Sequence, residues 1–521
     1  MKTFVKENKT KAFLFLIIVA QIMLVCFTFS KKEAYFIDEV LSFSLANREG
    51  TGYYHLPVHV WVDNEWYLQN MTAQEGSTFD FSIAYQNQVQ DVSPPLFYML
   101  LHGVCSLFPG KLSPWMGLGL NLFFYVGAVI LMYLLGKKVF QDEKVGLLMA
   151  GLFGITYGAV NTVIFLRMYM MATFMLLFHL CVYIYYFESE KIPTRGYVLF
   201  MVSAVLGCLT QYYFLIGAVF LGMWYVFKFL YEKRYTELKK YLVSAGVSGG
   251  IAILIFPAMI RHILRSGRGA ASFESLSQGN NFLSHLKVTF WILNDQMFGE
   301  LLEVMMILIL IGIVVLLCKK DRKVIFEKRY WIPMLAAGAG YFLVVTKVAP
   351  YQTDRYIMPT FPLAYFLIVG AAFAILCHFL DKKKVLCICL LLFAGISVGK
   401  LSTSSFHYLY EGYQENNVAQ DYTDEYCVVI SDDHGYWYYD IQALTQYKSF
   451  FWLRDTENTA FMDEIMEKIE PEGKFVLYGR NTWSQEEIND YVNKNFGSGW
   501  NCRQLEEYKN ERFFIYHCTK E

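Results

Sequence analysis

Apolar stretches long enough to cross a lipid bilayer recur from residue 12 to residue 400 of the 521-residue chain. A helical span needs about 20 apolar residues, because a helix rises about 1.5 Å per residue and the hydrocarbon core is about 30 Å thick. Short charged loops separate these stretches, so the pattern predicts an all-α polytopic membrane domain. The predicted spans, about eleven, cover residues 12–30, 113–136, 145–165, 168–187, 196–211, 212–230, 241–260, 301–318, 330–346, 356–379 and 384–400.

Composition excludes several classes of protein. The chain is 55% hydrophobic and only 17% charged, against about 25% in soluble domains. A formal net charge of -1 argues against a nucleic-acid partner, which normally requires a basic surface. No Walker motif or G-x-G-x-x-G opens a strand-turn-helix unit, and the eleven cysteines include no C-x-x-C pair. Nucleotide binding and a zinc-ribbon or thioredoxin-like centre are therefore not supported.

The distribution of charge predicts the orientation of the spans. The segment Pro94 to Phe108 is apolar, but its 15 residues reach only about 23 Å as a helix. If it does not cross, the loops at 137–144, 188–195, 231–240, 319–329 and 381–384 are all cytoplasmic and carry 18 Lys or Arg against 9 Asp or Glu. Basic loops favour the cytoplasmic side. We therefore expect an in-plane helix at the outer leaflet, a cytoplasmic amino terminus and an outer location for residues 31–112.

The last 120 residues differ in character from the rest. Strand-like segments at Cys427–Asp433, Phe475–Arg480 and Arg512–Cys518 alternate with helix-like ones, and Ser484 with Glu487 has the spacing of a helix capping box. Residues 1–400 are thus predicted to form the transmembrane domain, and residues 401–521 a small α/β domain outside the membrane. Cys502 and Cys518 lie on neighbouring predicted strands, where a disulfide can form.

The first outer loop carries the most distinctive acidic residues. Asp38 and Glu39 stand about eight residues beyond the first span, and Asp91 opens the segment DVSPPLFYMLLH. Carboxylates just above a membrane can accept a proton from an incoming hydroxyl or hold a divalent cation. A solvated acidic loop is the plainer interpretation of the pair when it is taken alone.

An acidic pair after the first span, followed by Asp-x-x-Pro-Pro-Leu-aromatic-Tyr, resembles the first outer loop of protein O-mannosyltransferases, lipid A aminoarabinose transferases and their bacterial relatives, which are GT-C enzymes. The segments FLRMYM, TQYYFL and DRYIMPTFP match further pieces in the same order, over residues 12–400. The chain departs from these relatives in having Ser93 where His is common, and Phe165 and Leu166 where Glu is common. Roles for His or Glu at those positions are therefore not carried over.

This resemblance implies an inverting sugar transfer from a polyprenyl-phosphate-linked donor, with Asp38 as the catalytic base and Glu39 and Asp91 near it. The acceptor is unknown, membrane lipids surround the enzyme, and no cofactor is implied with certainty, although the acidic residues can hold a divalent cation. A phosphate leaving group needs nearby cations more than a general acid. The candidate phosphate-binding residues are Arg261, Arg265, Arg355 and Arg167, and anchoring to lipid headgroups is the alternative role for them. The candidate substrate-binding residues are Tyr35, Tyr98, Tyr169, Tyr212 and Tyr356, with an interfacial aromatic belt as the alternative.

The segment from Ser266 to Asn281 is rich in Gly, Ser and Asn and is interpreted as a mobile loop that can close over the site. Two other functions compete with a transferase. A transporter or lipid flippase is expected to show repeats and charged groups in mid-membrane, whereas the spans contain almost none besides His179. A membrane-anchored binding protein that acts through its tail leaves the acidic first loop unexplained.

Overall fold

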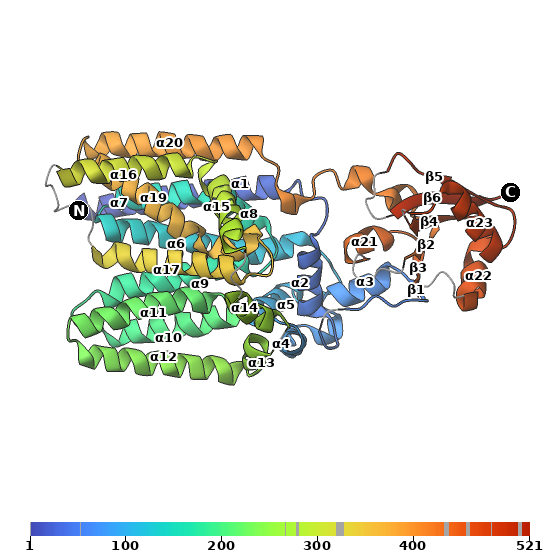
Figure 1. Cartoon of the computed structure of the whole chain (residues 1–521), viewed down its shortest axis with the longest axis horizontal. Helices are drawn as coiled ribbons and strands as arrows, with labels where there is room; N and C mark the ends of the chain where they lie inside the picture. Colours follow the sequence, from blue (N-terminus) through green and yellow to red (C-terminus); the bar gives the residue numbers. More distant parts are fainter. Residues whose placement is uncertain are drawn as a thin grey trace. The chain divides into compact units, whose positions relative to one another are not determined.

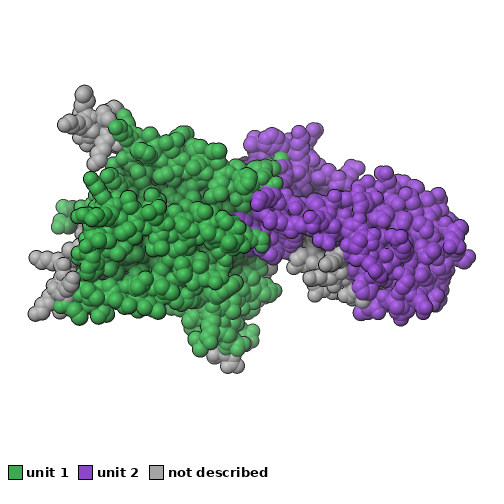
Figure 2. All heavy atoms as spheres, turned by 90° about the horizontal axis from the view of Figure 1, so that it is seen from above, with its two compact units in different colours: residues 1–30, 88–101, 115–405 green, residues 31–87, 102–114, 406–521 purple. Residues whose placement is uncertain are grey.

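The computed structural model describes residues 2–52, 54–265, 267–277, 281–318, 328–431, 437–454, 459–480, 482–508 and 513–521. Its chain divides into two compact units (Figure 2). The first unit comprises residues 1–30, 88–101 and 115–405, and the second comprises residues 31–87, 102–114 and 406–521. The carboxy-terminal residues thus share a unit with most of the first loop between apolar helices.

Long apolar helices build the first unit (Figure 1). Within the described residues, eight helices are long and apolar enough to cross a membrane, and ten spans result if each of two bent pairs counts as one. The pair α7 and α8 bends by 60°, and the pair α15 and α16 by 84°. The eight are α1 (Lys2–Phe29), α6 (Pro114–Phe140), α9 with its π-helical extension (Tyr169–Phe187), α11 (Phe214–Tyr231), α12 (Tyr235–Ile255), α17 (Lys328–Val348), α18 to α19 (Asp354–Leu376) and α20 (Lys382–Thr403).

The other helices of this unit are shorter or bent. They are α5 (Leu96–Cys105), α7 (Glu143–Gly154), α8 (Tyr157–Ile164), α10 (Thr194–Thr210), α13 (Ala258–Leu264), α14 (Gly267–Ser277), α15 (Phe282–Phe298) and α16 (Leu302–Cys318). With α10 and the two bent pairs, every predicted apolar stretch is helical, which confirms the predicted polytopic helical membrane domain. The helix predicted at Pro94–Phe108 is α5, whose 10 residues cover about 15 Å, half of a bilayer core.

Small residues allow helices α6 and α7 to pack closely. A side chain added at Gly146 would place its Cβ 2.6 Å from the carbonyl oxygen of Tyr133, and one added at Gly136 would place it 3.0 Å from the Cα of Gly146. Such distances leave no room for a methyl group. Close helix approach through small residues is the usual means of packing in membranes, where the lipid supplies no hydrophobic drive between helices.

A six-stranded sheet forms the core of the second unit. Its strands are β1 (Trp61–Val62), β2 (Tyr426–Ile430), β3 (Ser449–Leu453), β4 (Lys474–Arg480), β5 (Trp500–Gln504) and β6 (Phe513–Lys520), in the order β1-β3-β2-β4-β6-β5. Strands β3, β2 and β4 are parallel, and the remaining pairings are antiparallel. The helices of the unit are α2 (Ile37–Asn47), α3 (Asn64–Met71), α4 (Phe81–Gln90), α21 (Trp437–Leu444), α22 (Met462–Glu472) and α23 (Gln485–Asn495).

The predicted strands correspond to β2, β4 and β6, although Asp433 and Arg512 lie outside the described residues. The capping box is confirmed, because Ser484 Oγ accepts a hydrogen bond from the Glu487 N–H at 3.3 Å and Glu487 Oε2 accepts one from the Ser484 N–H at 2.7 Å. Cys502 and Cys518 face each other on β5 and β6 and form a disulfide.

Strand β1 comes from the first loop and pairs with β3, so that Trp61 opposes Phe451. Trp61 packs its ring on Tyr426 and Phe451. This position in the sheet explains its aromatic character.

Candidate functional site

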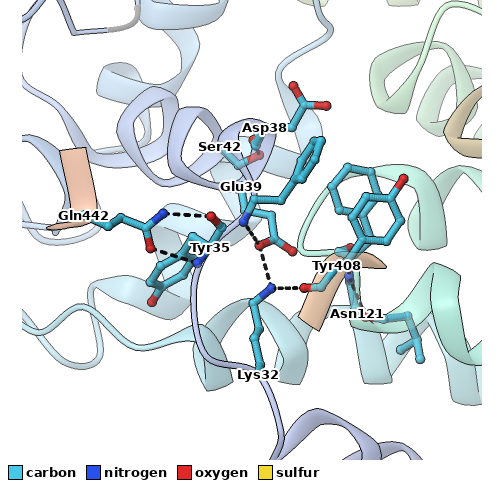
Figure 3. A network of polar contacts seen from close by, with 11 residues as sticks. Lys32, Tyr35, Asp38, Glu39, Ser42, Asn121, Tyr408 and Gln442 are labelled. Carbon is cyan, nitrogen blue, oxygen red and sulfur yellow. Dashed lines mark hydrogen bonds and ion pairs between the residues drawn. The ribbon is translucent and has the colours of Figure 1, made fainter. Parts of the chain in front are cut away.

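The acidic pair of the first loop lies in the first turn of α2, within the second unit (Figure 3). Glu39 is fully buried, and its Oε2 accepts a hydrogen bond from the Phe36 N–H at 2.7 Å. The same oxygen lies 2.7 Å from Nζ of Lys32, a side chain that is also buried. Glu39 therefore forms an ion pair with Lys32 and caps the first turn of its own helix.

Asp38 occupies a different environment. Its side chain is half-buried, and Figure 3 shows its carboxylate pointing away from Lys32 and Glu39. A carboxylate in the first turn of a helix lies near the positive end of the helix dipole, which favours the ionised form that a base must have. A role of Asp38 as the catalytic base stays a prediction.

Tyr35 precedes this turn. Both backbone groups of Tyr35 bond to the Gln442 side chain of α21, at 2.8 Å for its N–H and 2.7 Å for its carbonyl oxygen. Its hydroxyl is buried and has no hydrogen-bond partner among the described residues. Burial, followed by the nearby Tyr67 and Glu39, raises the pKa of Tyr35 well above its usual value. The phenol therefore stays protonated and can donate a hydrogen bond.

In the first unit, a cluster of aromatic and charged side chains surrounds Arg167. The Arg167 side chain is buried, with its guanidinium carbon 6.0 Å from the ring centre of Tyr98. It also interacts electrostatically with Tyr169, Asp91 and Tyr356. These five residues come from three separate sequence motifs, so the fold brings together groups that lie far apart in the chain.

The rings around Tyr356 extend this cluster. Tyr169 and Tyr213 meet the Tyr356 ring edge-on at 6.5 and 5.7 Å. Arg355 places its guanidinium carbon 5.1 Å from the centre of the same ring. Tyr341 fixes the backbone here by donating a hydrogen bond to the Tyr356 carbonyl oxygen at 3.0 Å. A guanidinium on an aromatic face is a cation–π contact, which keeps its polar edge available for an anion.

Tyr212 belongs to the same region through His262 of α13, a residue that the sequence analysis did not select. The Tyr212 hydroxyl is 2.8 Å from His262 Nδ1, and His262 Nε2 is 3.2 Å from the carbonyl oxygen of Val89. A carbonyl can only accept, so Nε2 carries the proton and Nδ1 accepts from Tyr212. Burial lowers the pKa of His262, Arg261 lowers it further, and the Val89 carbonyl and Asp91 oppose the shift. The neutral ring is thereby favoured, and in this form Nδ1 accepts the hydrogen bond of Tyr212.

The two predicted phosphate-binding arginines of α13 are exposed. Arg261 donates a hydrogen bond to the Val89 carbonyl oxygen. Arg265 lies one residue past the end of α13, so the two side chains are not on one face of a continuing helix. The loop predicted at 266–281 is also different, because residues 267–277 form α14. The Ser272 hydroxyl of α14 bonds to the Val348 carbonyl oxygen at 3.2 Å, which ties this helix to α17.

Another polar group missed by the sequence analysis lies between helices of the first unit. Asp354 Oδ2 accepts hydrogen bonds from Asn161 at 2.8 Å and from Gln296 at 2.9 Å. These partners are far apart in the sequence, so no local pattern pointed to them. Among the described residues, no group of three or more His, Cys, Asp or Glu is placed to hold a metal ion. A divalent cation at Asp38 and Glu39 stays a prediction.

Comparison with solved structures identifies the fold. ArnT from Cupriavidus metallidurans bound to undecaprenyl phosphate matches with a TM-score of 0.51 at 12% identity, over 97% of this chain and 98% of that chain. The apo form of the same protein matches with a TM-score of 0.49 at 11% identity, over 96% and 97%. An oligosaccharyltransferase of Archaeoglobus fulgidus, in complex with Zn and sulfate, gives 0.43 at 14% identity, over 92% of this chain and 72% of that one.

No family model and no curated protein sequence matches the chain. At 12% identity the likeness to ArnT is one of fold. It runs over nearly the whole of both chains, including the carboxy-terminal unit. The chain is a multi-pass helical membrane protein with the fold of a GT-C membrane glycosyltransferase.

Proposed function

We propose that the chain is a glycosyltransferase that moves a sugar from a polyprenyl-phosphate donor to an acceptor at the outer face of the cytoplasmic membrane. The observation that carries the proposal is the match over nearly the full length of both chains to a protein whose structure contains undecaprenyl phosphate. The acidic residues in the first turn of α2 also support the proposal, because a carboxylate in this position is suited to act as a base.

The proposed reaction inverts the anomeric centre. Asp38 accepts the proton of an acceptor hydroxyl as the hydroxyl oxygen attacks the anomeric carbon. The bond from that carbon to the phosphate oxygen breaks, and the polyprenyl phosphate leaves with the bonding electron pair. A phosphate anion is a stable leaving group, so the other requirement is positive charge near its oxygens.

Two sets of arginines can supply that charge. Arg167 and Arg355 lie among tyrosines, where a cation–π contact holds the guanidinium and its planar edge can bind phosphate oxygens. Arg261 and Arg265 are exposed and follow shortly after the apolar helix α12, and arginines near the end of a span often contact lipid phosphates. We assign donor phosphate to the first pair and a supporting or headgroup-binding role to the second.

The test is to incubate the purified protein, in lipid nanodiscs, with a panel of polyprenyl-phosphate sugars and with nucleotide sugars as controls. We expect at least one lipid-linked sugar to release free polyprenyl phosphate and no nucleotide sugar to release its nucleotide. Translocation of the lipid-linked sugars without cleavage would contradict the proposal and favour a flippase. The lipid-linked donor that is cleaved also identifies the sugar, because contacts between the protein and the sugar ring decide which donor reacts.

A further inference from the structure

The second unit contains a pocket that the proposed chemistry does not use. Its volume is about 290 Å³, close to the lower end of the range for small-molecule sites. The pocket lies between the segment 410–417, helix α21 and strands β4 and β6. Its lining residues are Tyr410, Glu411, Gly412, Tyr413, Asn416, Asn417, Asp440, Ala443, Tyr478 and Ile515.

The lining has the chemistry of a sugar site. Tyrosine rings offer flat apolar faces with a polar edge, and the exposed amide of Asn416 has donor and acceptor groups, as hydroxyl groups require. The buried amide of Asn417 instead bonds within the unit, to Gln446 Oε1 at 3.1 Å and to the Ala419 N–H at 3.3 Å. Among the described residues of the lining, the charged side chains are Glu411 and Asp440, and both are acidic. Two carboxylates repel a phosphate or a uronic acid. They accept hydrogen bonds from hydroxyls and attract an amino group.

Several contacts hold the pocket in shape. Tyr410 and Tyr413 meet edge-to-face, with ring centres 6.2 Å apart. The Tyr478 hydroxyl lies 3.2 Å from that of Tyr447 behind it. Tyr410 has a φ of 55°, a left-handed conformation that non-glycine residues seldom adopt and that persists where neighbouring contacts enforce it.

Both walls of the pocket bond to the segment that leads into Asp38. On one side, Gln414 donates its backbone N–H to Glu33 Oε2 at 2.9 Å and its side-chain amide to the Glu33 carbonyl oxygen at 3.1 Å. On the other side, α21 supplies Asp440 and Ala443 to the lining and Gln442 to the backbone of Tyr35. A ligand in the pocket therefore lies against the elements that position the candidate base.

We propose that this pocket binds a neutral or amino-sugar unit of the acceptor. That the bound saccharide is the acceptor rests on the proposed function, whereas binding of a saccharide in the pocket does not. The acceptor is then a glycan or glycoconjugate, and its recognition lies in the second unit, separate from the arginines assigned to donor phosphate.

The experiment measures retention of the purified full-length protein on an array of oligosaccharides that end in neutral hexoses, amino-hexoses or hexuronic acids. We expect retention on neutral or amino-sugar ends and not on uronic acids. Glu411→Gln combined with Asn416→Ala should weaken it at least about tenfold, because the negative charge of Glu411 and the hydrogen-bonding amide of Asn416 are lost. Both positions are exposed, so the variant should fold. Glu415→Gln, in the same segment but outside the lining, is the matched control and should bind as the unmodified protein does.

Retention on no glycan, preference for uronic acids, or equal retention of the double variant and the unmodified protein would overturn the proposal. Its failure is separable from failure of the proposed function. Cleavage of a lipid-linked donor by a protein that retains no glycan contradicts the pocket alone. Glycan retention that depends on Glu411 and Asn416, without cleavage of any donor, contradicts the transferase and leaves the saccharide site standing.

Discussion

Neighbouring residues of like chemistry can have unlike roles, and Asp38 and Glu39 illustrate how burial separates them. The ion pair between Glu39 and Lys32 removes two charges from water, and such a pair persists only when its partners satisfy each other. The Asp38 side chain is half-buried, and its carboxylate points away from Lys32 and Glu39 (Figure 3). We therefore expect different consequences when the two carboxylates are replaced by amides.

Asp38→Asn keeps the size of the side chain and removes the base. We expect the transfer step to slow by about 100 to 10,000-fold, the usual contribution of general base catalysis, while donor binding largely survives. Single-turnover kinetics with the donor identified from the panel separates the two quantities. Glu49→Gln, an exposed acid after the same helix, is the control and should leave the rate unchanged. Full transfer activity in the Asp38→Asn protein would remove Asp38 as the base.

Glu39→Gln should instead destabilise the protein, because it leaves Lys32 buried without its counter-charge. Breaking a buried ion pair from one side typically costs about 3 to 5 kcal/mol. Adding Lys32→Met to Glu39→Gln should recover much of the loss, since no unpaired charge is then buried. Denaturant unfolding of the three proteins measures this effect. Equal stability of Glu39→Gln and the unmodified protein would show that the pair is not a structural element.

At the level of single residues, motif position could identify Asp38, Asp91, Arg167 and the tyrosines, because each stands near the end of an apolar stretch. The convergence of Asp91, Tyr98 and Tyr356 on Arg167 joins residues that lie about 70 to 190 positions from it in the chain, which no local pattern contains. The pairing of Lys32 with Glu39 was missed for a similar reason, because a lysine after a span is equally typical of a headgroup contact.

A short helix is held in place by a few specific hydrogen bonds to its neighbours, and α13 is an example. Its seven residues are too few for a stable isolated helix. His262 anchors it to Tyr212 on one side and to the Val89 carbonyl oxygen on the other. Burial in this position lowers the pKa of His262 and so favours the neutral imidazole, which makes the attachment of α13 depend on pH.

We expect acid to loosen α13. The pKa of His262 is lowered in the folded state, so the unfolded or detached state binds a proton more readily. The stabilisation is therefore complete above the ordinary histidine pKa of about 6.5 and is lost as pH falls below it. Hydrogen exchange of residues 258–264, corrected for its intrinsic pH dependence, should be several-fold faster at pH 5 than at pH 7.5. In His262→Gln the corrected rates should not change with pH, and a similar acceleration in that variant would exclude His262 as the cause.

Helix α23 offers a second test at this scale, because its capping box was predicted from sequence and is present. Ser484→Ala removes the oxygen that accepts from the Glu487 N–H and should cost about 1 kcal/mol of stability. Glu486→Gln, in the same turn but outside the box, should change the stability much less. Chemical denaturation followed by the near-ultraviolet signal of the second unit compares them. Identical midpoints for all three proteins would show that this helix end does not limit stability.

Among the elements, the sequence predicts those that carry a strong periodic or compositional signal. The apolar stretches are long, so their helices follow from hydropathy alone. Strand β1 has two residues and shows no periodicity, and only its pairing with β3 makes it a strand. The sequence predicts a loop at the segment of α14, because Gly and Ser are poor helix formers. The segment is nevertheless helical, and its hydrogen bond to α17 supports the helix.

For the whole molecule, the division into two units does not follow the order of the sequence. Residues 31–87 and 102–114 belong with residues 406–521, and β1 completes a sheet whose other strands begin at Tyr426. Hydropathy finds the apolar helices but cannot show which loops fold together, because that depends on contacts over more than 300 residues. The predicted domain boundary near residue 400 follows the change in composition. The second unit of the structure also includes most of the first loop, which this boundary leaves in the other domain.

The arrangement of the second unit supports one prediction about topology. Its disulfide between Cys502 and Cys518 is of the kind that persists outside a reducing cytoplasm, and the basic loops at 137–144 and 381–384 favour the opposite side of the membrane. An alkaline phosphatase fused after Glu521 should therefore be active and a green fluorescent protein fused there dark. Fusions that end within the loop 381–384 should show the reverse, because one apolar helix, α20, separates the two positions. An active phosphatase at 381–384 would invert every span and place Asp38 on the cytoplasmic side, where nucleotide sugars are the available donors.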